Sequence, residues 1–157
     1  MDIISGLHDR LLFAIPKKGR LHEHCISLLK GADINFHRHN RLDIALVKNL
    51  PIALVFLPAP DIAKFVGEGN VDLGITGQDM VAECQVTDKI DKIIELGFGV
   101  CKLQVQVPVK SGINKVEELV GKKIVTSFDV LAANYFAELD EKYLTDKEKA
   151  EDKKNQN

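Results

Sequence analysis

The sequence predicts an α/β fold, because short apolar runs alternate with amphipathic segments of helical spacing. Apolar runs of strand length cover residues 11–15, 42–47 and 52–57. Between the first two runs, residues 21–29 are apolar at i, i+4, i+5, i+7 and i+8, which predicts a helix that ends at Gly31. After the third run, we expect Asp61 to cap a short helix over residues 62–67.

The alternation continues in the second half of the chain. We expect a strand over residues 71–76, a helix over 78–84, and further strands over 92–99, 101–109 and 121–127. Residues 101–109 alternate apolar and polar side chains, so one face of that strand should be polar. A turn at 108–112 and a short helix within 114–120 precede the last strand, and a final helix should run to about Leu139. From Asp140 onward, eleven of eighteen residues are charged, which predicts a frayed helix or a disordered tail.

Composition narrows the class of protein. The 157 residues are 45% hydrophobic and 28% charged, as in one ordinary domain or two small lobes. The net charge of −2 gives no global basis for binding nucleic acid or a membrane. Three widely spaced cysteines without a CxxC pair are typical of reduced intracellular proteins. No secretory signal or membrane-length apolar run is present, so we expect a cytoplasmic protein.

A basic junction follows the first predicted strand. The stretch "PKKGR" places Lys17, Lys18 and Arg20 around Gly19, where the predicted helix begins. Backbone amides at a helix start, with flexible cations beside them, can bind phosphate. A solvated turn is the more ordinary explanation of such a motif. Arg41 directly precedes the next predicted strand and could reach the same crevice, although a lone arginine there is more often a surface residue.

A second junction lies in "VDLGITGQD". Asp72 stands at the start of the predicted strand, and Gly74, Thr76 and Gly77 follow toward its carboxyl end. Ligands of open α/β sheets sit outside the carboxyl ends of strands. Thr76 offers a hydroxyl and Gly77 an accessible amide, whereas tight packing that requires glycine explains the pattern equally well.

Other candidate sites are weaker. Gly97 and Gly99 flank Phe98 and could form a hinge, or an ordinary turn or bulge. Cys101 has no identifiable base, so we expect a structural thiol. Four of the five histidines form two pairs, His22 with His24 and His37 with His39, each two residues apart, which is not the spacing of a zinc site, and no protein metal site is expected.

Five linked motifs run along about residues 10–136: "RLLFAIPKKGRL", "NRLDIAL", "DIAKFVGEGNVDLGITGQD", "LGFGVCKLQVQVP" and "GKKIVTSF". In this order and spacing they resemble the ATP phosphoribosyltransferase family, in its long fungal form. The resemblance implies a periplasmic-binding-protein-like architecture of two α/β lobes, with ATP and phosphoribosyl pyrophosphate (PRPP) in the cleft between them. It implies that adenine N1 attacks the anomeric carbon while magnesium-bound pyrophosphate leaves.

The resemblance also implies roles for residues of these junctions. The implied substrate-binding residues are Lys17, Lys18, Gly19, Asp72, Gly74, Thr76 and Gly77. Arg20 and Arg41 are implied charge stabilisers, and positioning and charge stabilisation replace a protein nucleophile. Mg²⁺ is expected to bind through the substrate phosphates. The family forms homo-oligomers, and inhibition by histidine is expected only with its C-terminal regulatory domain.

Two departures from the family pattern bear on activity. Pro58 and Pro60 precede "DI", where many relatives carry an arginine. Segments resembling "SGSVE" and "DLVESG", which hold the ribose phosphate in the family, are absent. We therefore expect an incomplete first lobe over residues 1–99, a truncated second lobe over 100–139, and a charged tail over 140–157. The expected function is the first step of histidine biosynthesis, with this chain inactive alone. The alternative is a nucleotide-binding fragment, or a solute-binding α/β module, without catalysis.

Overall fold

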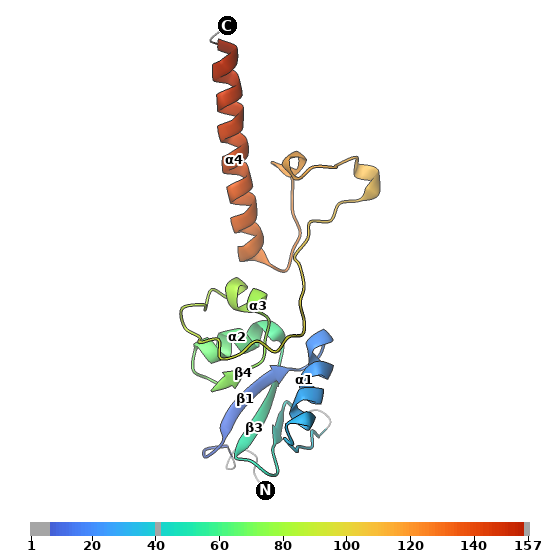
Figure 1. Ribbon diagram of the computed structural model, residues 1–157, viewed down its shortest axis with the longest axis vertical. Coiled ribbons are helices and arrows are strands. Elements are labelled where there is room, and N and C mark those ends of the chain that lie inside the picture. The colour runs from blue at the N-terminus through green and yellow to red at the C-terminus, as the bar shows by residue number, and fades with distance from the viewer. Residues whose placement is uncertain (1–6, 40–41, 156–157) are drawn as a thin grey trace. The chain divides into compact units, whose positions relative to one another are not determined.

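The computed structural model describes residues 7–39 and 42–155, and the chain divides into two compact units, Met1–Cys101 and Lys102–Asn157. The first unit contains a four-stranded sheet in the order β2-β3-β1-β4, with helices packed on it (Figure 1). The predicted α/β class is confirmed at this level. Among the described residues, no helix is long and apolar enough to cross a membrane.

The direction of the strands determines what meets at each end of the sheet. The central strand β1 (Leu11–Pro16) is parallel to β3 (Ile52–Leu57) on one side and to β4 (Leu73–Gly74) on the other. The short strand β2 (Ile44–Leu46) runs antiparallel to β3. The carboxyl ends of β1, β3 and β4 therefore lie together with the amino end of β2, at what we call the carboxyl edge.

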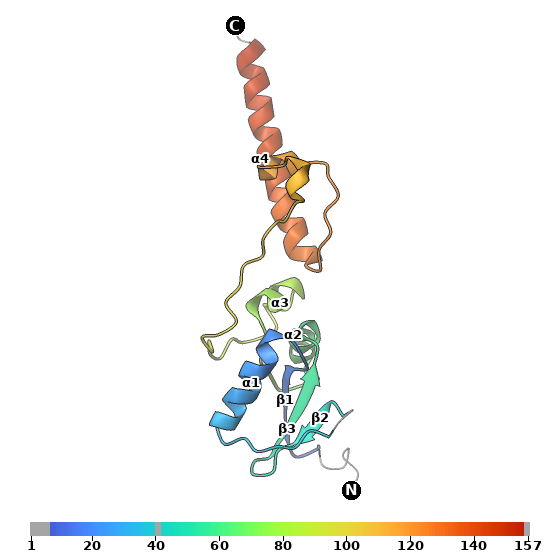
Figure 2. The same ribbon diagram turned by 90° about the vertical axis from the view of Figure 1, so that its right-hand side faces the viewer.

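The two main helices cover opposite faces of the sheet, because neighbouring residues of a strand point to opposite sides. Helix α1 (Arg20–Gly31) buries Cys25 and Leu29 in a cluster with Ile15 of β1. Helix α2 (Ala59–Gly67) buries Ile62 against Ala14, the preceding residue of β1. Figure 2 shows α1 alongside β1. Helix α3 (Gln78–Glu83) packs against α2.

The start of α2 differs from the prediction. The helix begins at Ala59 with Pro58 at its cap position, so Asp61 lies inside the first turn and does not cap the helix. Proline is favoured at a helix start because its φ is already helical and it has no amide hydrogen to leave unpaired. The "PAPD" stretch therefore begins the helix earlier than the apolar pattern alone predicts.

The strands predicted over residues 92–99, 101–109 and 121–127 are not formed. Residues 85–128 contain two short 3-10 helices, Val109–Ser111 and Val116–Leu119, and no strand. Val100, Val109 and Val125 are 94%, 100% and 98% exposed. A strand requires a hydrogen-bonding partner, and alternation alone does not supply one.

Helix α4 (Asp129–Asn155) extends beyond Leu139, where the pattern predicted its end, and includes most of the charged segment expected to be frayed or disordered. The predicted division into lobes and a tail remains a proposal.

Candidate functional site

The carboxyl edge brings the two predicted junctions together. The chain leaves β1 for α1 on one face of the sheet, and leaves β4 for α3, which packs with α2 on the other face. In open α/β sheets, the carboxyl ends of adjacent strands whose chains diverge in this way are the usual ligand position. The amide of Ile75 donates to the carbonyl of Ala14 at 3.0 Å, so the chain leaves β4 beside the end of β1.

The basic junction presents unpaired charge at this edge. Gly19 has φ 94° and ψ −174° at the cap position of α1. An added Cβ would meet nothing within 4 Å, so its backbone conformation, and not lack of space, requires glycine here. The side chains of Lys18 and Arg20 are exposed, and neither has an ion-pair partner in the described ranges 7–39 and 42–155.

Lys17 is engaged in a different way. Its Nζ lies 2.7 Å from Oδ2 of Asp43, and the guanidinium of Arg38 lies 3.2 Å from Oδ1 of the same carboxylate. The hydrogen bond from Lys17, with the positive charges of Lys17 and Arg38, lowers the pKa of Asp43 below its ordinary value. Sequence reasoning missed both Arg38 and Asp43. The available signal was an acidic residue within the predicted strand over 42–47, but its contact with Lys17 depends on β2 being antiparallel.

The second junction is held by its own contacts. The hydroxyl of Thr76 donates to the carbonyl of Ala59 at 3.2 Å, which links the end of β4 to the first turn of α2. Gly77 occupies the cap position of α3. The carboxylate of Asp79 lies against Gly77, in the space that a Cβ would occupy, and accepts from the amide of Met80 at 2.9 Å.

Asp72 and Gly74 contact other parts of the first unit. The carboxylate of Asp72 accepts from the amide of Leu12 at 2.7 Å, near the opposite end of β1. A Cβ on Gly74 would lie 2.7 Å from Cγ2 of Ile62 and 3.0 Å from Cγ2 of Val66, so glycine permits β4 to pack closely on α2. The structure therefore places these two residues in the support of the edge.

Arg41, the remaining predicted cation, lies outside the described residues. At the end of β3, Pro58 and Pro60 contribute no charge, as the sequence departure indicated. His22 Nδ1 lies 2.6 Å from the carbonyl oxygen of Pro16, and His24 stacks on Phe98 with ring centroids 5.2 Å apart. In the part of the chain that the structure describes, no cluster of three or more His, Cys, Asp or Glu side chains could hold a metal ion.

The third predicted junction packs against α1. Gly97 and Gly99 have φ of 74° and 78°, and Phe98 between them lies on the apolar cluster that includes Leu21.

Two cysteines of the first unit differ in exposure. Burial raises the pKa of the Cys25 thiol to about 11. Cys101 is exposed, with its Sγ 3.9 Å from Oδ2 of Asp79.

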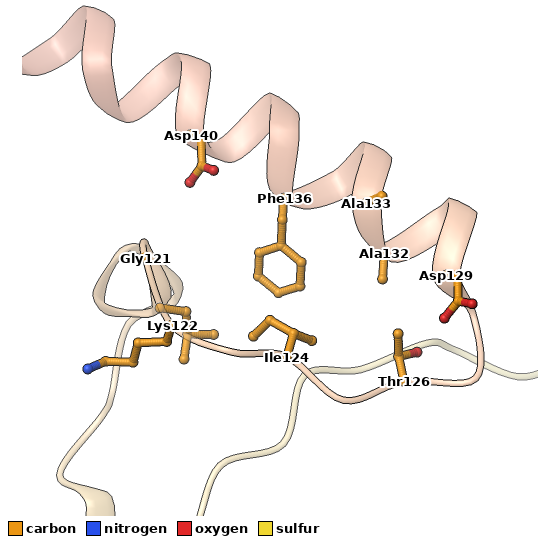
Figure 3. A pocket seen from close by; sticks show the side chains of 10 residues that line it. Gly121, Lys122, Ile124, Thr126, Asp129, Ala132, Ala133, Phe136 and Asp140 are labelled. Atoms are coloured by element: carbon orange, nitrogen blue, oxygen red, sulfur yellow. The ribbon is translucent and has the colours of Figure 1, made fainter.

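The second unit contains a hollow of about 370 Å³ between α4 and the segment before it (Figure 3). Phe136 of α4 faces Ile124, and Lys122, Asp129 and Asp140 contribute charged groups around them. None of the residues predicted to bind substrate lines this hollow.

Comparisons with known proteins identify the family. The family model for ATP phosphoribosyltransferase (HisG) matches residues 58–148, which include the β4–α3 junction. ATP phosphoribosyltransferase from Candida albicans is 61% identical over 142 residues, which are 90% of this chain and 48% of that protein. The enzyme from Saccharomyces cerevisiae is 62% identical over 140 residues, covering 89% of this chain and 46% of that protein.

A solved structure is also similar. A chain of the ATP phosphoribosyl transferase (HisG:HisZ) complex from Thermotoga maritima is 29% identical, with a TM-score of 0.41, over 48% of this chain and 35% of that chain. The present chain spans about half the length of the curated fungal relatives it matches. The extent of the family match and the identity to the fungal enzymes show that the chain belongs to the ATP phosphoribosyltransferase family.

Proposed function

We propose that the chain binds ATP at the carboxyl edge, as part of an enzyme that transfers phosphoribosyl from PRPP to N1 of ATP and releases pyrophosphate. This is the first step of histidine biosynthesis. The observation that carries the proposal is the parallel pairing of β1 with β4, because the basic loop of residues 17–20 follows one of these strands and Thr76 and Gly77 follow the other, at the same edge of the sheet. Family membership supports the reaction, and the geometry of the edge supports the place of the nucleotide.

The proposed roles follow from the contacts of each side chain. Lys18 and Arg20 have no ion-pair partner among the described residues and are assigned to the phosphates, with the amide of Gly19. The Thr76 hydroxyl, which donates to Ala59, keeps its lone pairs for a ligand donor. Gly77 contributes an amide. Mg²⁺ enters bound to the substrate phosphates, and Arg41 stabilises the charge of the leaving pyrophosphate.

Asp72 and Gly74 support this site indirectly in the proposal. The Asp72 carboxylate connects the start of β4 to the amide of Leu12, and Gly74 sets the distance between β4 and α2. Together these two contacts would fix the position of residues 75–77 at the carboxyl edge. Asp72 and Gly74 would therefore affect substrate binding only through the position of residues 75–77.

The complete reaction is proposed for a two-lobe, homo-oligomeric and cytoplasmic enzyme. These 157 residues correspond to about half of each fungal relative. We propose that they bind ATP but do not complete the transfer alone, because PRPP also has to be held in line with adenine N1, and lost positioning costs several kcal/mol of barrier. Inhibition by histidine is assigned to the longer enzyme.

Calorimetric titration with ATP and Mg²⁺ tests the nucleotide site. The double variant K18M/R20M should bind ATP about tenfold or more weakly, since hydrogen bonds from charged groups contribute about 1.5–3 kcal/mol each. K30M is the matched control, because Lys30 is in the last turn of α1, at the end away from the basic loop. Equal weakening by both variants, or no ATP binding by the parent chain, would contradict the site.

The same samples test the catalytic proposal. ATP, PRPP and Mg²⁺ are added, and release of pyrophosphate and formation of phosphoribosyl-ATP are measured. No product from a folded chain that binds ATP is the expected result. Product formation would show that these 157 residues suffice, which contradicts the need for further residues but not the nucleotide site.

A further inference from the structure

The ion pair between Lys17 and Asp43 lies at the carboxyl edge but on the side away from β4. Because β2 is antiparallel to β3, its amino end meets the carboxyl end of β3, where the amide of Phe56 donates to the carbonyl of Asp43 at 2.7 Å. The amide of Lys17 donates to the carbonyl of Leu57 at 2.8 Å. The Lys17 side chain therefore extends across the end of β3 to reach Asp43.

Asp43 is the fixed member of this pair. The guanidinium of Arg38 lies 4.0 Å above the ring of Phe56, which is 1% exposed. The same guanidinium donates to the carbonyl of Leu42 at 3.1 Å and to the Asp43 carboxylate at 3.2 Å. Arg38 thus anchors Asp43 and remains its partner when Lys17 leaves.

Among the described residues, the Lys17 ammonium contacts one carboxylate, that of Asp43. Both side chains of the pair are about half exposed, at 43% for Lys17 and 48% for Asp43. In an exposed ion pair of this kind, the paired state is favoured over the separated state by only a few-fold in equilibrium constant. A polyphosphate in the adjoining crevice would present several charged oxygens to the same ammonium group, so exchange of partners is energetically accessible.

We propose that Asp43 is an internal competitor of the nucleotide phosphates for Lys17, holding the ammonium on the β3 side until an anionic ligand draws it toward the crevice. This inference rests on the proposed nucleotide site. Asp43 acts through Lys17 and is a positioning residue that sets the affinity of the site. Lys17 joins Lys18 and Arg20 only in the occupied state.

Calorimetric titration of ATP into the folded chain at low ionic strength, with Mg²⁺ present, tests the competition. D43N should bind ATP about threefold to fivefold more tightly, which is the factor released when an exposed ion pair no longer competes. A merely structural role for Asp43 would change affinity in the opposite direction. E23Q is the control, because it removes one negative charge from the first turn of α1 and Glu23 forms no ion pair with Lys17.

A double-mutant cycle with K17M shows whether the effect passes through Lys17. In the K17M background, D43N should change the affinity for ATP no more than E23Q does. Tighter binding that persists without Lys17, or a D43N affinity equal to or weaker than that of the parent, would overturn the competition and leave the nucleotide site intact. Absence of ATP binding by the parent and by every variant would overturn the nucleotide site and the competition with it. Circular dichroism of each variant confirms that folded chains are compared.

Discussion

At the scale of single residues, Gly74 controls the packing of β4 on α2. A Cβ at this position would lie 2.7 Å from Ile62 and 3.0 Å from Val66. We expect G74A to lower the free energy of unfolding by about 1–3 kcal/mol, because both neighbours have to shift in a packed layer. Urea denaturation measures the change. G31A is the control, since nothing lies within 4 Å of its Cβ position and the change should be close to neutral.

The carboxylate of Asp72 makes a second testable contact. It accepts from the amide of Leu12 at 2.7 Å, and loss of this hydrogen bond in D72A should lower the free energy of unfolding by about 1 kcal/mol. The same denaturation experiment measures it. Unchanged stability together with weaker ATP binding would show that Asp72 contacts substrate directly, contrary to its position in the structure.

Cys25 makes stability depend on alkaline pH. Burial raises the pKa of its thiol to about 11, from an ordinary value of 9.0. Between these two pKa values the folded chain keeps a proton that the unfolded chain loses. The contribution of the protonated Cys25 thiol to the free energy of unfolding is therefore complete below about pH 9 and is lost as pH rises toward 11. Within that window, the free energy of unfolding should fall by about 1.4 kcal/mol for each pH unit.

The measurement compares the parent chain with C25A by urea denaturation across that pH range. C25A should be less stable than the parent at neutral pH, because a buried side chain is lost. The difference in free energy of unfolding between the parent and C25A should narrow from pH 9 to 11. A constant gap for C25A would refute the assignment.

At the scale of elements, unpaired segments expose their apolar side chains. Val109 and Val125 of the second unit are 100% and 98% exposed. We expect V109T/V125T to leave the free energy of unfolding within about 0.5 kcal/mol of the parent value. Self-association at high concentration should decrease, because exposed strand-forming residues promote pairing between chains. Sedimentation velocity measures the association, and a large loss of stability would show that these valines are packed.

The predicted strands formed only where a neighbouring strand was available to pair with them. β1 and β3 form where the apolar runs predicted them, because they pair with each other and share a buried cluster with α1. Residues 101–109 show clearer alternation than either, yet form no strand. Alternating apolar and polar residues predict which face of a strand would be buried, but they do not predict whether a neighbouring strand is available for pairing.

At the scale of the whole molecule, the site was predictable only in outline. The glycine and cation pattern indicated both junctions, and parallel β1 and β4 bring them to one edge. The different role of Lys17 was not predictable, because it depends on β2 being antiparallel and on the position of Asp43. The start of the strand was correctly predicted as the place of Asp72, but its hydrogen bond to the amide of Leu12 follows from strand register, which a single sequence does not reveal.

The central claim is that nucleotide phosphates bind at the carboxyl edge of β1 and β4. The most direct measurement is the change in backbone amide NMR shifts when ATP and Mg²⁺ are added to the isotopically labelled chain. The account predicts the largest changes at residues 17–20 and 75–78, with little change at Leu12 and Asp72. Changes confined to residues 119–140 around the hollow of the second unit, or no saturable change at the carboxyl edge, would contradict it.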